Sequence, residues 1–248
     1  MKIQLIGFND LFNPNYKLDI FKEIVENTDA DLILFPGHTF RDEDDLFYEE
    51  IDNRHSIIVT ELENANPTSC MFTSNELFVF KDGLPYDLFS CQLFATADDI
   101  NYGGKELMHK FFDEISRRRL TCCGKSIVIL QCGETSLLVS SKANNYKAEF
   151  RFKDDPELNK RYEELLSTTD IFLNPIHTVQ GEQGIMKQRR ITLSSDGRYY
   201  FSTASLPEDM AGKLNSKRLQ YIYHNGEEIT VKPVFDKVEN YVSRTFEI

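Results

Sequence analysis

The chain has 248 residues, of which 41% are hydrophobic and 12% aromatic, so it can bury a large core and is not of the disordered class. Its formal net charge of −12 repels nucleic acid and anionic lipid, and this argues against both as main partners. The N-terminal apolar stretch is too short for a secretion signal, and no run of about 18 apolar residues predicts a membrane span. We therefore predict a cytoplasmic protein whose five cysteines, which include no C-x-x-C pair, are reduced.

The N-terminal third has the pattern of a parallel α/β unit. Residues 2–8 and 31–36 predict apolar strands, the second ending at a proline. The helix predicted between them has an apolar face formed by Leu18, Phe21, Ile24 and Val25. This order of strand, helix and strand is typical of a βαβ unit in a sheet that is covered on both faces. The acidic run 42–50 is interpreted as a solvated loop or helix start rather than a metal cluster.

The middle of the chain continues with strands and two clear helices. Residues 105–119 carry one apolar stripe and predict a helix that ends on three arginines, which we interpret as structural. Asp155-Pro156 predicts the capped start of a second helix. Strands are predicted over 56–62, 76–83 with an Asp82-Gly83 turn, 86–95, 126–132 and 170–175.

The C-terminal quarter predicts antiparallel strands. Residues 189–205 have the alternation and the Asp-Gly turn of a hairpin, and residues 219–233 have an Asn225-Gly226 turn. The chain has no linker, repeat or low-complexity segment, so we predict one α/β domain over residues 1–248.

Three predicted strands end on residues that could carry chemistry. His38 follows the strand 31–36, His177 follows 170–175, and the strand 126–132 runs into Cys132 and Glu134. Ligand sites of open α/β sheets form at the carboxyl ends of strands, so we expect these four side chains to converge. Gly133 allows a close bend there, and backbone N–H groups of such a turn can hold an oxyanion.

Each of these residues also has a simpler interpretation. Cys132 is either a nucleophile, which needs a nearby base or cation, or a small packing residue. The two histidines are either bases or hydrogen-bonded structural residues. A zinc site formed by Cys132 and both histidines lacks the short-range ligand pairs typical of zinc, so no metal is predicted. A nucleotide-binding α/β domain is the third alternative, but the chain has no glycine-rich phosphate loop.

The order of these segments resembles the nitrilase, or carbon–nitrogen hydrolase, superfamily over most of the chain. The similar blocks are "ADLILFPG", "SNELFVFKDGLP", "GKSIVILQCGE" and "TDIFLNPIHT". The resemblance implies an α-β-β-α sandwich, a homodimer or larger homo-oligomer, and hydrolysis of small non-peptide C–N substrates through a thioester. It also implies a catalytic Glu, Lys and Cys, with no metal or organic cofactor.

Two of the three catalytic positions implied by the resemblance are substituted. Cys132 matches the nucleophile and Glu134 the acid that follows it, but Gly37 stands where the base should be. Gln92 or Cys91 stands at the lysine position, and Lys105 and Lys110 are placed on a predicted helix instead. The segment 138–152 is also longer than the usual connection of the family.

Two hypotheses follow for the function. In the first, the chain is an active thiol hydrolase in which His38 or His177 activates Cys132 and Glu134 orients a partner or the substrate. In the second, it is a catalytically inactive binding or assembly module. The loss of both the base and the lysine favours the second, because each group contributes a large factor to the rate. The retention of Cys132 with Gly133 and Glu134 favours the first.

Overall fold

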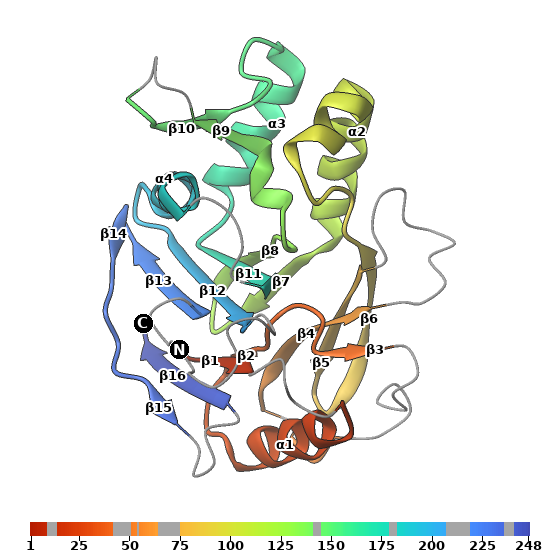
Figure 1. Cartoon of the computed structure of the whole chain (residues 1–248), viewed down its shortest axis with the longest axis vertical. Helices are drawn as coiled ribbons and strands as arrows, with labels where there is room; N and C mark the ends of the chain where they lie inside the picture. Colours follow the sequence, from red (N-terminus) through yellow and green to blue (C-terminus); the bar gives the residue numbers. More distant parts are fainter. Residues whose placement is uncertain are drawn as a thin grey trace.

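The structure, a computed structural model, describes residues 1–8, 14–41, 51–53, 55–63, 75–140, 145–178, 183–206, 219–235 and 241–248. Two β-sheets face each other and carry helices on their outer sides (Figure 1). This is the α-β-β-α sandwich that the resemblance implied. The acidic run 42–50 lies outside the described residues.

The first sheet contains both chain ends and follows the order β15-β16-β1-β2-β4-β5-β6, with β3 paired to β4. β1 is parallel to β2, as expected for a βαβ unit, and antiparallel to β16. The two termini therefore lie side by side (Figure 1), and the Met1 ammonium donates to the Ile248 carbonyl at 2.8 Å. The strands are β1 (Lys2–Phe8), β2 (Leu32–Leu34), β3 (Phe40–Arg41), β4 (Ile57–Glu63), β5 (Asn75–Lys81), β6 (Leu84–Cys91), β15 (Val234–Phe235) and β16 (Tyr241–Glu247).

The second sheet has the order β14-β13-β12-β11-β8-β7, with β8, β11 and β12 parallel. Its strands are β7 (Arg119–Cys122), β8 (Lys125–Ile129), β11 (Ile171–Thr178), β12 (Tyr199–Ser205), β13 (Gln220–His224) and β14 (Glu227–Glu228). A separate hairpin is formed by β9 (Leu138–Ser140) and β10 (Ala148–Phe150). The Asn225-Gly226 turn joins β13 to β14, which confirms that predicted hairpin.

The helices form the two outer layers. α1 (Pro14–Asn27) covers the first sheet, and α2 (Ala97–Arg117), α3 (Pro156–Ser167) and α4 (Gln183–Ser194) cover the second (Figure 1). Asp155 caps α3 as predicted, by accepting from the backbone N–H groups of Glu157 and Leu158. α2 begins eight residues earlier than predicted because Thr96 and Asp99 form a capping box ahead of a kink at Gly104.

Three apolar layers hold the sandwich together. One lies between the sheets, where Leu34 and Val59 of the first sheet and Ile129 and Leu173 of the second belong to one buried cluster. The other two lie under α1 and under the opposite helices. Strands that are buried on both faces explain why the sequence shows continuous apolar runs rather than alternation. No helix within the described part of the chain is long and apolar enough to cross a membrane.

The hairpin predicted over residues 189–205 is wrong. These residues are the end of α4 followed by β12. The alternation of Ile191, Thr192 and Leu193 imitates a strand, but Arg190, Leu193 and Ser194 are buried at helical spacing. The Asp196-Gly197 turn has positive φ angles and joins the helix to the strand.

The expectation of five reduced thiols is also wrong, because Cys91 is disulfide-bonded. Cys122, Cys123 and Cys132 are free. Disulfides persist mainly in oxidising compartments. The bonded Cys91 therefore does not support the cytoplasmic location, which stays a prediction.

Candidate active site

Cys132 lies in a turn that follows β8. β8 ends at Ile129, three residues earlier than predicted, and a short 3₁₀ helix begins at Glu134. The Cys132 side chain is half-buried and packs beside a small apolar cluster that includes Ile176 and Val242. The strand therefore delivers the thiol to a turn at its carboxyl end, where a ligand site was expected.

Gly133 is required both by its backbone conformation and by the space around it. Its φ is +82°, and a Cβ atom there would lie 2.1 Å from the carbonyl oxygen of Ala95. Gly124 has a similar φ of +74°, but a Cβ atom there would have nothing within 4 Å. A substitution at Gly124 therefore measures the cost of the backbone conformation without a steric clash.

We expect Gly133→Ala to destabilise the fold substantially more than Gly124→Ala. The left-handed conformation costs an alanine roughly 1–2 kcal/mol at either position, whereas only the alanine at position 133 must displace the backbone of residue 95. Urea denaturation of both variants measures the difference. Equal losses of unfolding free energy would contradict the close approach of the two backbones.

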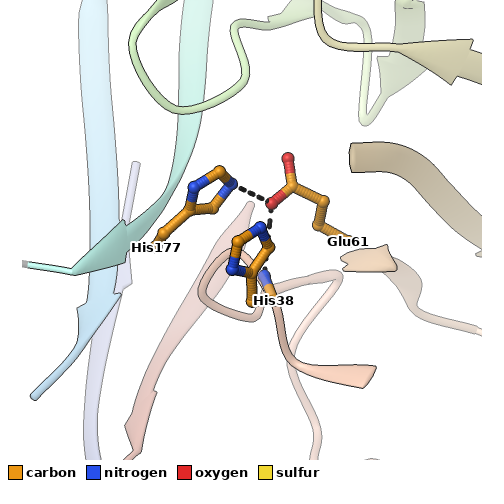
Figure 2. Close-up of side chains that lie close together, drawn as sticks. All are labelled: His38, Glu61 and His177. Carbon is orange, nitrogen blue, oxygen red and sulfur yellow. Dashed lines mark hydrogen bonds and ion pairs between the residues drawn. The ribbon is translucent and has the colours of Figure 1, made fainter. Parts of the chain in front are cut away.

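His38 and His177 meet face to face beside this turn. His177 comes from β11 and His38 follows β2, so the two rings belong to different sheets (Figure 2). Their centroids are 3.6 Å apart and their planes differ by 14°. Cys132 interacts electrostatically with His177. Of the four side chains that were predicted to converge, Cys132, His38 and His177 lie together, whereas Glu134 does not join them.

Glu61 completes the cluster and was missed from the sequence. It lies on β4, has no exposed surface, and accepts from His177 Nε2 at 2.5 Å through Oε2 (Figure 2). The same oxygen accepts from the His38 backbone N–H at 3.2 Å, and Oε1 accepts from Gln131 Nε2 at 2.7 Å. The available signal was an acid inside the apolar strand 56–62, since ionised side chains are almost never fully buried unless paired.

The protonation states follow from burial and from these contacts. Burial opposes the charge of His177, but Glu61 and Cys132 outweigh it and raise the pKa of His177 to about 11. Burial would raise the pKa of Glu61, but the charge and hydrogen bond of His177 hold it below its usual value. Burial and the neighbouring positive charge of His177 lower the pKa of His38. The cluster therefore contains a His177–Glu61 ion pair beside a neutral His38.

The side chain missing at position 37 has no room in this structure. A Cβ atom on Gly37 would lie 2.2 Å from the His177 ring and 2.6 Å from Glu61 Oε2. The Gly37 backbone N–H donates to the Ile176 carbonyl at 3.1 Å and so connects the two sheets at this point. His177 and Glu61 thus occupy the space next to the position where the resemblance placed the base.

The position expected to hold a lysine carries a buried neutral amide. Gln92 accepts from Asn75 Nδ2 at 2.7 Å and donates to the Phe94 carbonyl at 3.0 Å. Asn75 in turn hydrogen-bonds the His38 ring. Lys105 and Lys110, which follow this position in the sequence, form ion pairs at helix surfaces, Lys105 with Asp155 and Lys110 with Glu106. Neither supplies the positive charge that the resemblance implied.

Glu134 supports the turn instead of joining the histidine cluster. It is fully buried, and its Oε2 accepts from Arg118 Nη1 at 2.5 Å and from the Gln131 backbone N–H at 2.8 Å. Its Oε1 accepts from the Leu93 backbone N–H at 3.1 Å. Burial raises the pKa of Glu134 and Arg118 opposes that rise. The arginine run at the end of α2 is structural here, as predicted, because Arg118 fixes the turn that carries Cys132.

The stacked histidines do not form a metal centre as arranged. One ligand atom from each of His38, Glu61 and His177 lies within 4.8 Å of the others, a spacing compatible with a cation. A metal must lie near the plane of each imidazole that binds it, because the nitrogen lone pair lies in that plane. Two nearly parallel rings 3.6 Å apart share no such point, and His177 Nε2 already contacts Glu61.

Comparison with known proteins finds similarity in structure alone. No protein-family model matches the chain, and no curated protein matches it in sequence. Among solved structures, a glutamine-dependent NAD(+) synthetase from Cytophaga hutchinsonii aligns with 100% of this chain at 15% identity and a TM-score of 0.56. The chain spans 43% of that synthetase, less than half its length.

Two shorter proteins align over nearly their full lengths. A mutant of the Nesterenkonia AN1 amidase, from the nitrilase superfamily, covers 99% of this chain at 12% identity and a TM-score of 0.51. The alignment includes 90% of that amidase. XC1258 from Xanthomonas campestris, a CN-hydrolase superfamily protein with an arsenic adduct in its active site, covers 100% at 14% identity and a TM-score of 0.51, with 90% of its own chain aligned. At these identities the similarity shows the fold.

Proposed function

We propose, from the premise that this chain has the nitrilase, or carbon–nitrogen hydrolase, fold, that it hydrolyses the C–N bond of a small non-peptide amide or related compound. Cys132 is the nucleophile, His177 the proton donor and acceptor, and Glu61 the residue that orients and charges His177. Glu134 positions the turn that carries the nucleophile. One domain over residues 1–248, a homodimer and a cytoplasmic location belong to the same proposal.

The observation that supports this function is the grouping of Cys132, His177 and Glu61. His177 lies between a thiol and a buried carboxylate that accepts its Nε2 hydrogen bond at 2.5 Å. A nucleophile, a base and a third group that orients the base form the arrangement typical of thiol and serine hydrolases. A histidine that stays protonated beside a cysteine stabilises the thiolate, which is the reactive form.

The proposed reaction has two steps. The Cys132 thiolate attacks the carbonyl carbon, and the C–N bond breaks as His177 transfers its proton to the leaving nitrogen. This releases an amine or ammonia and leaves a thioester. Neutral His177 then takes a proton from a water molecule whose oxygen attacks the thioester, and the C–S bond breaks to release the carboxylic acid and the thiolate. Glu61 stabilises the imidazolium that is present before and after each cycle.

The oxyanion of each step is held differently from the scheme that the resemblance implied. Gln92 is neutral and its amide is engaged by Asn75 and the Phe94 carbonyl. In this proposal the donors are backbone N–H groups of the turn at Cys132 and Gly133. Such backbone donors serve as oxyanion holes in many acyl-transfer enzymes.

The alternative function is an inactive binding or assembly module. It is favoured by the neutral Gln92 and by the apolar cluster that packs against Cys132. The two functions differ in one measurable property, the reactivity of the Cys132 thiol.

The test is alkylation by iodoacetamide at pH 6.5, followed by peptide mapping. We expect Cys132, although half-buried, to react at least tenfold faster than the exposed thiol Cys123 of the same protein. An exposed thiol without a charged partner is about 1% thiolate at this pH, and a thiolate stabilised by His177 is not limited in this way. Reaction of Cys132 no faster than Cys123 would favour the inactive module. Ammonia release from a panel of small amides, with Cys132→Ala as control, then identifies the substrate.

A further inference from the structure

Two arginines meet on one serine directly behind the nucleophile turn. Arg151 directs Nε and Nη2 at the Ser136 carbonyl oxygen, both at 3.3 Å, and Arg189 directs Nη1 at Ser136 Oγ at 3.1 Å. Neither arginine forms an ion pair with a carboxylate among the described residues. Asp98 acts on Arg151 only through the electrostatic field. Two like charges are therefore held together in a chain whose net charge is −12.

The positions of these arginines are set by separate elements. Arg189 lies on α4, and Arg151 directly follows β10. The Arg151 backbone N–H donates to the Leu137 carbonyl at 2.9 Å, and Thr192 Oγ1 of α4 donates to the Ala148 carbonyl of β10 at 3.0 Å. The two guanidinium groups are thus preorganised by backbone and side-chain contacts.

One buried donor of this arginine pair has no partner among the described residues. Arg189 Nε is buried without a hydrogen bond. Buried donors of native proteins are nearly always paired with protein, water or an ion. Burial and the charge of Arg151 together lower the pKa of Arg189 to about 10, in agreement with a positive pair that has no carboxylate partner among the described residues.

We propose that Arg151, Arg189 and Ser136 form a binding site for an anionic ligand group, a phosphate or a carboxylate. The planar guanidinium presents a fork of donors that matches both groups, and a bound anion removes the repulsion between the two arginines. Half-burial strengthens that attraction relative to an exposed arginine pair. This inference goes beyond the proposed function, because binding here does not require Cys132 to be a nucleophile.

The site is linked to the nucleophile through a short backbone connection. The Ser136 N–H donates to the Gly133 carbonyl at 2.8 Å, and Gly133 is next to Cys132. A ligand held on Ser136 therefore acts on the turn that sets the position of the thiol. We expect an anion at this site to change the reactivity of Cys132.

The experiment measures the melting temperature of the full chain in sodium phosphate, sodium malonate and sodium chloride at equal ionic strength. The variants are Arg189→Gln, Arg189→Lys and Arg151→Gln. Arg189→Lys keeps the positive charge but loses the fork of guanidinium donors. If a substitution at Arg189 prevents folding, Arg151→Gln still tests the proposal. Arg119→Gln is the matched control, since Arg119 is also half-buried and also donates to a carbonyl oxygen, that of Thr168 at 3.2 Å.

Phosphate, malonate or both should raise the melting temperature of the wild type and of Arg119→Gln in a saturable way, by about 5 °C near 100 times the dissociation constant. The salt that raises the melting temperature shows whether the ligand group is a phosphate or a carboxylate. Arg189→Gln and Arg151→Gln should lose most of the shift, and Arg189→Lys should lose part of it. No shift over chloride in the wild type, or the same shift in all variants, would overturn the site. A saturable shift with an unchanged rate of Cys132 alkylation would overturn its link to the nucleophile.

Discussion

Substitution of His177 by glutamine is expected to slow the alkylation of Cys132 by about 100-fold at pH 6.5, because a thiol of ordinary pKa is only about 1% ionised there. Hydrolysis of any substrate found should fall by about 10²- to 10⁴-fold, the usual contribution of a positioned acid–base group. Alkylation quenched at a series of times, followed by peptide mapping, measures the rate of Cys132 modification. Product release measures the rate of hydrolysis.

His38→Gln is the matched control for this prediction. His38 stacks on His177 at 3.6 Å but is neutral, and its ring hydrogen-bonds Asn75 rather than Glu61. We expect its loss to change the alkylation rate by less than tenfold. An equal loss of rate in both variants would assign the two histidines to one functional unit and would contradict the assignment of the thiolate-stabilising role to His177 alone.

The same His177 variant also has a pH signature in stability. A histidine whose pKa is raised from its ordinary value of 6.5 to about 11 stabilises the folded state fully below pH 6.5, and this contribution is lost as the pH rises through 11. The difference in unfolding free energy between wild type and His177→Gln should therefore shrink as the pH rises from neutral towards 11. A difference that is independent of pH would show that His177 is not charged in the folded protein.

Arg118→Met is expected to destabilise the fold by about 3–5 kcal/mol, the usual cost of leaving one partner of a buried ion pair uncompensated. Arg118 and Glu134 have no exposed side-chain surface, and Arg118 also donates to Ser90 Oγ and the Cys91 carbonyl, each at 2.5 Å. The substitution removes all three contacts and leaves the carboxyl of Glu134 buried. Urea denaturation monitored by circular dichroism measures the loss.

The adjacent arginine provides the control. Arg117 pairs with Glu114 at 3.4 Å, and its side chain is 64% exposed. Exposed ion pairs contribute little to stability, so Arg117→Met should leave the denaturation midpoint nearly unchanged. Because Arg118 holds Glu134 and Glu134 holds the Gln131 backbone, a folded Arg118→Met protein should also show altered Cys132 alkylation. Similar midpoints for the two variants would contradict the buried pair.

Most of the strands and three of the four described helices were predictable from local pattern. Apolar runs such as 31–36 and 126–132, the Asp82-Gly83 and Asn225-Gly226 turns and the Asp155 cap each have a short-range physical cause. The helix α4 was not predictable in this way, because Ile191, Thr192 and Leu193 alternate as a strand does. The burial of Arg190 becomes visible only in the folded chain. A short apolar stretch does not distinguish the two periods.

The sequence by itself determined the order of blocks, the α-β-β-α class and the positions of Cys132, His38 and His177 at strand ends. Only the tertiary structure decided what surrounds the thiol. Glu61 lies inside a strand whose local sequence predicts burial alone, and its contact with His177 spans 116 residues of chain. Glu134, two residues after Cys132 in sequence, is directed towards Arg118 instead. Such partnerships depend on how two sheets are stacked, and that packing brings together residues that no local pattern connects.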